Sequence, residues 1–355
     1  MISNHQIFMF QLALDYLQET QSQVGDRIIN FLPTTHSSAE VEKFYRMMMD
    51  YPTRAGKRIR PALCLLMCET WGAKAEKALD TAVALELLQS WLLIHDDIED
   101  ESILRRGVPC LHQTYGIPLA INVGDGLHCK MWEMLIQNQR TLGYELTFQI
   151  LSEFIDLSNR VVEGQHIELS WVENNAWDQT EQDYWQMCVQ KTAWYTCITP
   201  CRLGALIGGA KTSELDAFIE IGMNLGVAFQ IQDDVLNLIG QEDVYGKEIG
   251  GDIEEGKRTL ILIHLFDACT QAQSQDLIKI MGKPREAKTK NEVQHVLDLM
   301  KSYGSIDYAQ QRAKSLADQA QHGFQEHFAH LASPSALIAK SIFSNLIRFI
   351  IERQH

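Results

Sequence analysis

The sequence has no cysteine motif, no secretion signal and no long apolar run, and these absences exclude several classes of protein. Its eight cysteines are scattered, and no CxxC pair occurs. We interpret them as reduced core residues of a cytoplasmic protein. The N-terminus lacks a basic segment followed by an apolar run, and no stretch of about 18 apolar residues occurs, so we expect neither a signal peptide nor a transmembrane segment.

Basic residues are scarce. The 355 residues include 31 lysines and arginines against 46 aspartates and glutamates, which gives a formal net charge of −15. This balance argues against nucleic acid as a partner, because neutralising its phosphates requires a basic surface. An anionic substrate would need a local basic site, or metal ions, to offset the negative charge.

The alternating apolar and polar runs that predict β-strands are absent, and no low-complexity linker divides the chain. Apolar residues instead recur at helical spacing, from the segment 5–32 to three helices over 275–355. We therefore predict an all-α protein with a single domain over residues 1–355. The segments with candidate chemistry lie within 56–259.

One acidic cluster follows an apolar helical segment directly. Five acidic side chains fall within the six positions from Asp96 to Glu101. On a helix, Asp96 and Asp100 lie one turn apart on the same face, as do Asp97 and Asp100. Carboxylates so placed repel one another unless a cation binds, and all-oxygen ligands suit Mg²⁺. Taken alone, the cluster is also compatible with a solvated helix end.

A second acidic pair makes the metal interpretation stronger. Asp233 and Asp234 again end an apolar helical segment, and a Gly- and Lys-rich segment over 247–258 follows. Two helices that each present paired aspartates to one cavity would hold several Mg²⁺ ions and a diphosphate between them. Glycines allow the tight loop, and lysines reach phosphate oxygens.

These motifs occur together, in the same order, in one known family. They are Gly56–Pro61, Asp96–Asp100 with Arg105-Arg106-Gly107, Gly164-Gln165, Lys191-Thr192, Phe229–Asp234 and Gly250–Thr259. On these residues the chain resembles the trans-isoprenyl diphosphate synthases of the polyprenyl synthetase family, and most of all the bacterial geranylgeranyl diphosphate synthases. The resemblance implies the isoprenoid synthase helical bundle around a central apolar cavity.

The resemblance also implies an activity. It is the head-to-tail (1′-4) condensation of isopentenyl diphosphate with an allylic diphosphate, through Mg²⁺-assisted ionisation, condensation and proton elimination. It further implies a homodimer and about three Mg²⁺ ions per active site. The residues that match the family's metal-binding motifs are Asp96, Asp97, Asp100, Asp233 and Asp234. Asn237 stands where the second motif usually has a third aspartate, so we do not expect it to be a ligand.

Basic and polar residues match the family's two diphosphate sites. Those of the isopentenyl diphosphate site are Lys57, Arg60, Gln89 and Arg106. Those of the allylic diphosphate site are Arg105, Lys191, Lys247 and Lys257. Thr192 and Gln230 match polar groups near the reacting carbons, where oxygen dipoles stabilise a carbocation. The released diphosphate is the expected base for the final proton loss.

Product length in this family depends on the residues at the bottom of the cavity, four and five positions before the first aspartate. Here they are Leu92 and Trp91. One bulky and one medium-sized residue favour a C20 product, with C15 or longer products as alternatives. A terpene cyclase is a rival interpretation, but the second diphosphate site argues against it. A non-catalytic subunit would be expected to lack one aspartate motif.

Overall fold

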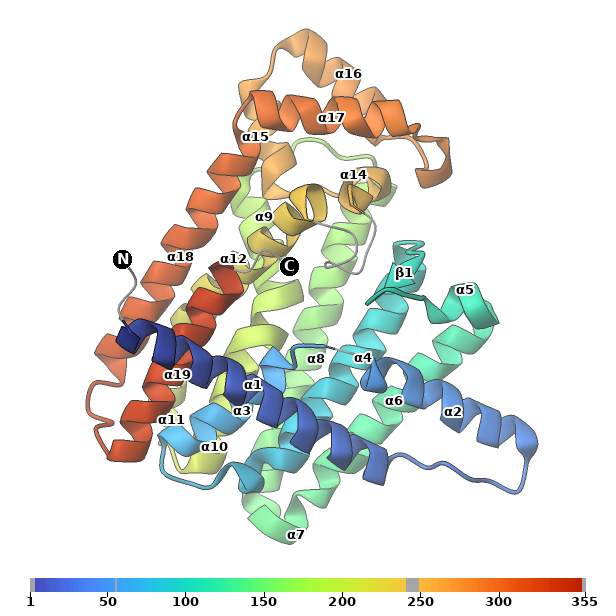
Figure 1. Ribbon diagram of the computed structural model, residues 1–355. Coiled ribbons are helices and arrows are strands. Elements are labelled where there is room, and N and C mark those ends of the chain that lie inside the picture. The colour runs from blue at the N-terminus through green and yellow to red at the C-terminus, as the bar shows by residue number, and fades with distance from the viewer. Residues whose placement is uncertain (1–3, 55, 241–248, 353–355) are drawn as a thin grey trace.

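The computed structural model describes residues 4–54, 56–240 and 249–352. It is 81% helical, which confirms the all-α prediction (Figure 1). The strands among the described residues are β1 (Leu104–Arg105) and β2 (Val108–Pro109), an antiparallel pair in which Arg105 is opposite Val108. Lys247 lies outside the described residues, so its predicted role stays a prediction.

The chain begins with a series of helices that leads to the first acidic motif and beyond it. These are α1 (Asn4–Phe31), α2 (Ala39–Thr53), α3 (Ile59–Thr70), η1 (Ala75–Ala78), α4 (Leu79–Glu99), α5 (Leu111–Tyr115), α6 (Ile117–Gln137), α7 (Gln139–Leu142) and α8 (Tyr144–Glu173). The middle of the chain forms α9 (Glu181–Cys188), the π-helix η2 (Val189–Ile198), α10 (Thr199–Gly208), α11 (Thr212–Leu215) and α12 (Ala217–Ile239). The remaining elements are α14 (Gly251–Glu255), α15 (Leu260–Ala268), α16 (Gln271–Met281), η3 (Arg285–Ala287), α17 (Lys290–Ser302), α18 (Ser305–His327) and α19 (Pro334–Glu352).

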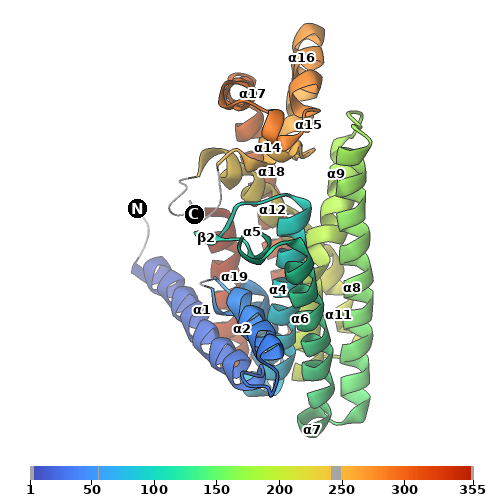
Figure 2. The ribbon, with the colours of Figure 1, turned by 90° about the vertical axis from the view of Figure 1, so that its right-hand side faces the viewer.

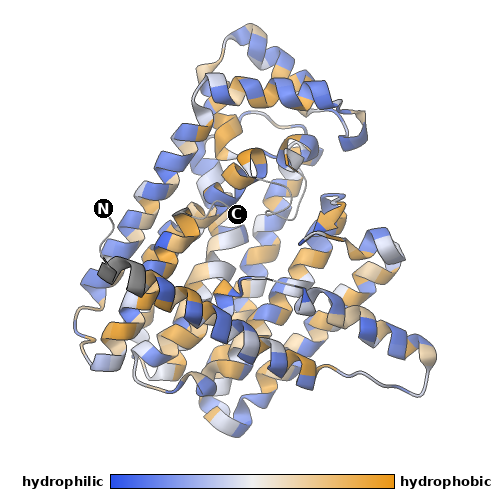
Figure 3. Ribbon diagram, viewed as in Figure 1, coloured by the Kyte–Doolittle hydropathy of each residue, from blue (hydrophilic) through white to orange (hydrophobic). Residues whose placement is uncertain are grey.

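Helix α4, which carries the first acidic motif, is completely buried along two of its turns. Every residue from Thr81 to Leu88 is buried, including Glu86. This agrees with a helix whose sequence is apolar around most of its circumference, which predicts a position inside a bundle. Figure 3 shows the contrast with α17 and α18, which are largely hydrophilic on their outer faces. Helix α4 therefore carries its acidic C-terminal end out of an apolar core.

Two clusters of buried side chains form the core. One gathers residues of α4, α6 and α8, and the other gathers residues of α12, α15, α18 and α19. Helix α3 contributes to both clusters, through Leu63 in one and Leu65 in the other. We propose on this ground that residues 1–355 form a single domain, as the sequence predicts.

Two glycines of α6 mark close packing between helices. A Cβ atom on Gly124 of α6 would lie 2.4 Å from the His95 ring of α4, and one on Gly126 would lie 2.4 Å from Phe44 of α2. Since Cβ atoms are not tolerated at such distances, glycine lets α6 approach both helices. The π-helix η2 was not predicted. It ends at Ile198, and Pro200 lies in the first turn of α10, the helix that follows.

Helix α19 is long and largely apolar. Among the described residues, Pro334–Ile351 is long and apolar enough to cross a membrane by length and composition alone, with a mean hydropathy of 1.3. Serine, lysine, asparagine and arginine interrupt this stretch, so it is not a continuous apolar run. Core helices meet the same criterion, and in this structure Phe343, Leu346 and Ile347 are buried where α19 packs on α1, α3 and α18.

Candidate active site

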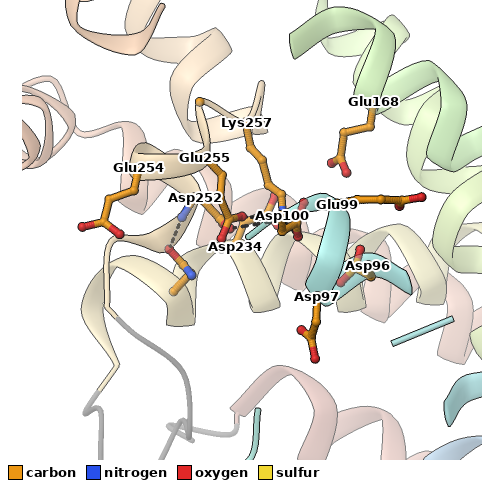
Figure 4. A network of polar contacts seen from close by, with 12 residues as sticks. Asp96, Asp97, Glu99, Asp100, Glu168, Asp234, Asp252, Glu254, Glu255 and Lys257 are labelled. Atoms are coloured by element: carbon orange, nitrogen blue, oxygen red, sulfur yellow. Dashed lines mark hydrogen bonds and ion pairs between the residues drawn. The ribbon is translucent and has the colours of Figure 1, made fainter. Parts of the chain in front are cut away.

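The first acidic motif lies at the C-terminal end of α4. The Asp100 amide donates to the carbonyl of Asp96 at 2.8 Å, so the two residues are separated by one helical turn, as predicted. Asp97 is 0% exposed and has different neighbours. It accepts hydrogen bonds from the Tyr51 hydroxyl and from Arg105, whose Nε lies 2.9 Å from Oδ1. Figure 4 shows the Asp97 side chain directed away from Asp100.

The second motif has a similar arrangement near the end of α12. Asp234 is buried, and its carboxylate accepts hydrogen bonds from the Tyr184 hydroxyl at 2.7 Å and from Gln230 Nε2 at 2.8 Å. Burial raises the pKa of Asp234 to about 7, although both hydrogen bonds act in the opposite direction. In each motif, therefore, a buried tyrosine donates to the second of the two adjacent aspartates.

Two lysines neutralise the carboxylates of the site. Lys257 Nζ lies 2.7 Å from Asp100 Oδ2 and 2.8 Å from Glu255 Oε2 (Figure 4). Lys191 Nζ donates to Glu168 and lies 3.5 Å from Asp96 Oδ1. Burial disfavours the charge on both lysines, but the neighbouring carboxylates outweigh it and raise both pKa values. The site thus binds positive charge at two positions.

The donor set fits Mg²⁺. No three His, Cys, Asp or Glu side chains among the described residues converge closely enough to hold a metal ion in this structure. The carboxylates are nevertheless concentrated in one polar network (Figure 4), and Lys191 and Lys257 form ion pairs with some of them. Carboxylate oxygens are the ligands that Mg²⁺ takes in proteins, together with phosphate oxygens from a substrate.

Asn237 supports the loop after the second motif. Its side-chain oxygen accepts a hydrogen bond from the Asp252 amide at 3.0 Å, and its carbonyl accepts one from Gly250 at 2.7 Å. Gly250 has a φ of 83°, a left-handed conformation that glycine adopts without strain. Asn237 thereby fixes the start of α14.

Three of the predicted isopentenyl diphosphate residues, Lys57, Arg60 and Arg106, lie at or beside the start of α3. Arg60 is buried, donates to Thr196 Oγ1 at 2.7 Å, and lies over the Tyr195 ring at 4.0 Å. The Arg106 guanidinium packs against Gly56, where a Cβ atom would lie 2.7 Å from Cζ. Lys57 Nζ lies 5.1 Å from the centre of the Phe349 ring. Gln89 is half-buried on α4.

Glu86 is a part of this basic region that the sequence analysis missed. It is 1% exposed, and its Oε1 lies 3.8 Å from Arg58 Nη1. Its negative charge favours the charged form of Arg106, whose pKa burial lowers. Among the described residues, Glu86 Oε2 has no hydrogen-bond partner. In the sequence, Glu86 stands out as the one glutamate within the largely apolar segment 79–94, and this pattern could have identified it.

Thr192 and Gln230 are brought together as a pair. Thr192 Oγ1 donates to Gln230 Oε1 at 2.7 Å, and Gln230 in turn donates to Asp234. Gly164 allows this part of η2 to approach α8, because a Cβ atom there would lie 2.2 Å from the Lys191 nitrogen. Gln165, the next residue, donates to Glu99 at 2.7 Å. The motif Gly164-Gln165 therefore positions η2 against the end of α4.

Two further residues connect distant segments to the site and carried no clear sequence signal. Glu168 on α8 binds Lys191. Arg285 in η3 donates to the Asp100 carbonyl at 3.0 Å and to Glu255 at 2.8 Å, so the C-terminal part of the chain supports the first motif.

A cavity of about 350 Å³ adjoins the acidic motif. Trp91 and Leu92, the predicted chain-length residues, line it together with Asp96, Lys191 and Tyr195. Apolar side chains of α4 and α8 form much of the remaining wall, including Leu93, Val161 and Leu169. The cavity thus joins a charged end, suited to a diphosphate, to an apolar region suited to a hydrocarbon chain.

Comparison with known proteins identifies the family. The model of the polyprenyl synthetase family matches residues 41–300. The chain belongs to the polyprenyl synthetase family. It is therefore a prenyltransferase, a trans-prenyl diphosphate synthase, and its fold is the isoprenoid synthase fold.

Similar synthases make products of different length. A geranylgeranyl diphosphate synthase of Sulfolobus acidocaldarius is 32% identical over 340 residues, covering 96% of this chain and 98% of that protein. A geranylfarnesyl diphosphate synthase of Aeropyrum pernix is 31% identical over 302 residues, covering 84% and 90%. Both are archaeal, so the likeness inferred from the motifs extends beyond bacterial enzymes.

Solved structures of synthases agree with the fold. The geranylgeranyl pyrophosphate synthetase of Pyrococcus horikoshii has a TM-score of 0.83 at 32% identity, covering 97% of this chain and 99% of that one. A geranylgeranyl pyrophosphate synthase of Corynebacterium glutamicum, solved with isoprenyl diphosphate and magnesium, has a TM-score of 0.76 at 25% identity, covering 95% and 98%.

Proposed function

We propose that this synthase makes geranylgeranyl diphosphate by adding isopentenyl diphosphate to allylic diphosphates. The observation that carries the C20 assignment is the cavity beside Asp96, which Trp91 and Leu92 line. Sequence identity does not decide product length, because C20 and C25 synthases match the chain at 32% and 31%. One large side chain limits the hydrocarbon, and the medium-sized leucine leaves room beyond C15.

We assign one of the two substrates to each of the two basic groups of residues. Lys57, Arg60, Gln89 and Arg106 would bind isopentenyl diphosphate, since arginine offers paired donors to phosphate oxygens. Arg105, Lys191, Lys247 and Lys257 would bind the allylic diphosphate and offset the charge of the leaving group. A cyclase, which takes a single diphosphate, has no use for the first region, so its presence supports elongation.

The acidic residues would hold Mg²⁺, and we propose three ions bound through Asp96, Asp100, Asp233 and Asp234. Bound Mg²⁺ supplies charge neutralisation for the departing diphosphate. The paired oxygens of Thr192 and Gln230 lie beside Asp234, where their dipoles would stabilise the allylic carbocation. The diphosphate retained by the lysines would accept the final proton.

We assign Asp97 a different role from the one its motif suggests. Its carboxylate accepts hydrogen bonds from Tyr51 and Arg105 and is fully buried. Fixed in this way, Asp97 orients Arg105 toward the allylic site, and Asp96 and Asp100 remain as the ligands from α4. This revises the prediction that all three aspartates bind metal.

We also propose a cytoplasmic homodimer that associates through α6 and α8, which lie side by side (Figure 2). Large apolar side chains are exposed on these helices, and Tyr144 and Phe148 are 80% and 71% exposed. Burying them against a second copy would be favourable. Phe148→Glu should give a monomer by light scattering, and Ile338→Glu on α19 is the matched control.

The activity is tested by incubating the protein with Mg²⁺, isopentenyl diphosphate and dimethylallyl, geranyl or farnesyl diphosphate. A prenyl diphosphate extended by C5 units, with C20 as the main product, is the expected result. A cyclised hydrocarbon would favour the cyclase instead. Absence of any turnover with all three primers would contradict the proposed function.

A further inference from the structure

The Trp91 indole at the cavity is stacked on a histidine of the neighbouring helix. The rings of Trp91 on α4 and His128 on α6 have centroids 4.2 Å apart and planes inclined by 25°. The imidazole is fixed in turn, because Trp132 Nε1 donates to His128 Nε2 at 3.0 Å. Trp91, which lines the cavity, therefore has a positioned aromatic partner on α6.

The surroundings leave Trp91 little freedom to move toward α6. A Cβ atom on Gly124 would lie 3.3 Å from Trp91 Cδ1, which shows how closely the α6 backbone approaches the indole. The His95 ring lies edge-on to the indole, with centroids 6.0 Å apart. Stacked aromatic rings attract each other beyond their buried area. The His128 ring lies directly against one face of the indole.

We propose that His128 is a positioning residue for product length, because it holds the Trp91 indole at the bottom of the cavity. This rests on the proposed chain-length role of Trp91. A growing prenyl chain that reaches Trp91 stops there only while the indole keeps its place. Without the imidazole, the indole can turn into the vacated space, and the cavity becomes longer by part of a ring. The chain would then accept at least one more C5 unit.

Product ratios measure this directly, and they do not depend on how much of a variant is folded. Each protein is incubated with Mg²⁺, farnesyl diphosphate and excess labelled isopentenyl diphosphate, and chain lengths are resolved by chromatography. The variants are His128→Ala, His128→Phe, Trp91→Ala and the double variant His128→Ala/Trp91→Ala. The matched control is His322→Ala, a histidine exposed on α18.

We expect His128→Ala to raise the ratio of C25 to C20 products about tenfold, a change of roughly 1.4 kcal/mol in the relative barriers. His128→Phe and His322→Ala should keep the wild-type ratio, since phenylalanine preserves the stack. The double variant should match Trp91→Ala, because the histidine acts only through the indole. A wild-type ratio in His128→Ala, while Trp91→Ala makes longer products, would overturn the proposal alone. Failure of the wild-type protein to elongate would overturn the proposed function as well.

Discussion

Lys257 Nζ lies 2.7 Å from Oδ2 of Asp100, so a lysine occupies the cation position beside the first aspartate-rich motif. The same lysine is 2.8 Å from Glu255. Asp100 is also the residue proposed to ligate Mg²⁺, and Lys257 the one proposed to bind the allylic diphosphate. These roles require the pair to separate when metal and substrate bind, and the lysine to transfer from the carboxylate to the phosphate.

Removal of this lysine should therefore affect the metal-free protein and the substrate complex in different ways. Lys257→Met removes the ion pair of the buried Asp100, while Glu255 keeps its ion pair with Arg285, and we expect this loss to destabilise the metal-free protein by roughly 3 kcal/mol. Mg²⁺ should restore more stability to the variant than to the wild type, as measured by thermal unfolding with and without Mg²⁺. The KM for farnesyl diphosphate should rise. If Mg²⁺ raises the melting temperature of the variant and of the wild type equally, the proposed transfer of Lys257 from Asp100 to the phosphate is contradicted.

The buried carboxylates predict how metal binding depends on pH. Burial raises the pKa of both Asp100 and Asp234 to about 7. The folded protein thus retains protons that the unfolded chain releases near pH 4. This stabilising contribution is complete below that pH and is lost as the pH rises through 7. Mg²⁺ requires the ionised carboxylates, so it should raise the melting temperature more at pH 8 than at pH 6.

Calorimetry provides the check on this prediction. Mg²⁺ binding at pH 6 should release protons, seen as a dependence of the binding heat on the ionisation enthalpy of the buffer. Asp100→Asn should release fewer protons than the wild-type protein. Equal Mg²⁺ stabilisation at pH 6 and pH 8 would show that these carboxylates are ionised throughout the range.

The two adjacent aspartates of the first motif should respond differently to substitution. Asp97→Asn removes the partner of Arg105 and Tyr51, and we expect it to lower kcat by about 10–100-fold, as for groups that orient ligands. Asp96→Asn removes a proposed ligand and should lower Mg²⁺ affinity as well as kcat. A Mg²⁺ titration of each variant compares them. If Asp97→Asn and Asp96→Asn lose Mg²⁺ affinity equally, Asp97 is a metal ligand after all.

Substitution of Glu86 should change the KM for one substrate only. Glu86→Gln removes the buried negative charge beside Arg58, and the positive charges around Arg106 then repel each other without compensation. We expect the KM for isopentenyl diphosphate to rise roughly tenfold, equivalent to about 1.4 kcal/mol. The KM for the allylic diphosphate should stay close to the wild-type value. A similar rise in both KM values would point to general destabilisation, and Glu326→Gln on the exposed face of α18 is the control.

The sequence predicted the helices because they depend on local patterns, and the resemblance to the family supplied the proposed site residues. Asp96 and Asp100 share a face through helical geometry alone, and Trp91 and Leu92 follow from their position one turn earlier. Contacts between segments far apart in the sequence could not be predicted in this way. Tyr51 and Asp97 are 46 residues apart, and Asp100 and Lys257 are 157 apart, so no periodicity connects them.

Several features depend on the tertiary structure. A row of aspartates does not show which carboxylate turns into the core, so the burial of Asp97 could not be predicted. The π-helix η2 was not foreseen because its extra residue per turn depends on packing against α8, where Gly164 admits the Lys191 backbone. Trp91 was identified, but its partner His128 depends on how α6 lies beside α4.

The most direct test of the C20 assignment is the product that the wild-type protein forms from farnesyl diphosphate, with excess isopentenyl diphosphate and Mg²⁺. A cavity that ends at Trp91 predicts addition of one C5 unit and accumulation of geranylgeranyl diphosphate. Accumulation of C25 or longer prenyl diphosphates under these conditions, or failure to extend farnesyl diphosphate at all, would contradict it.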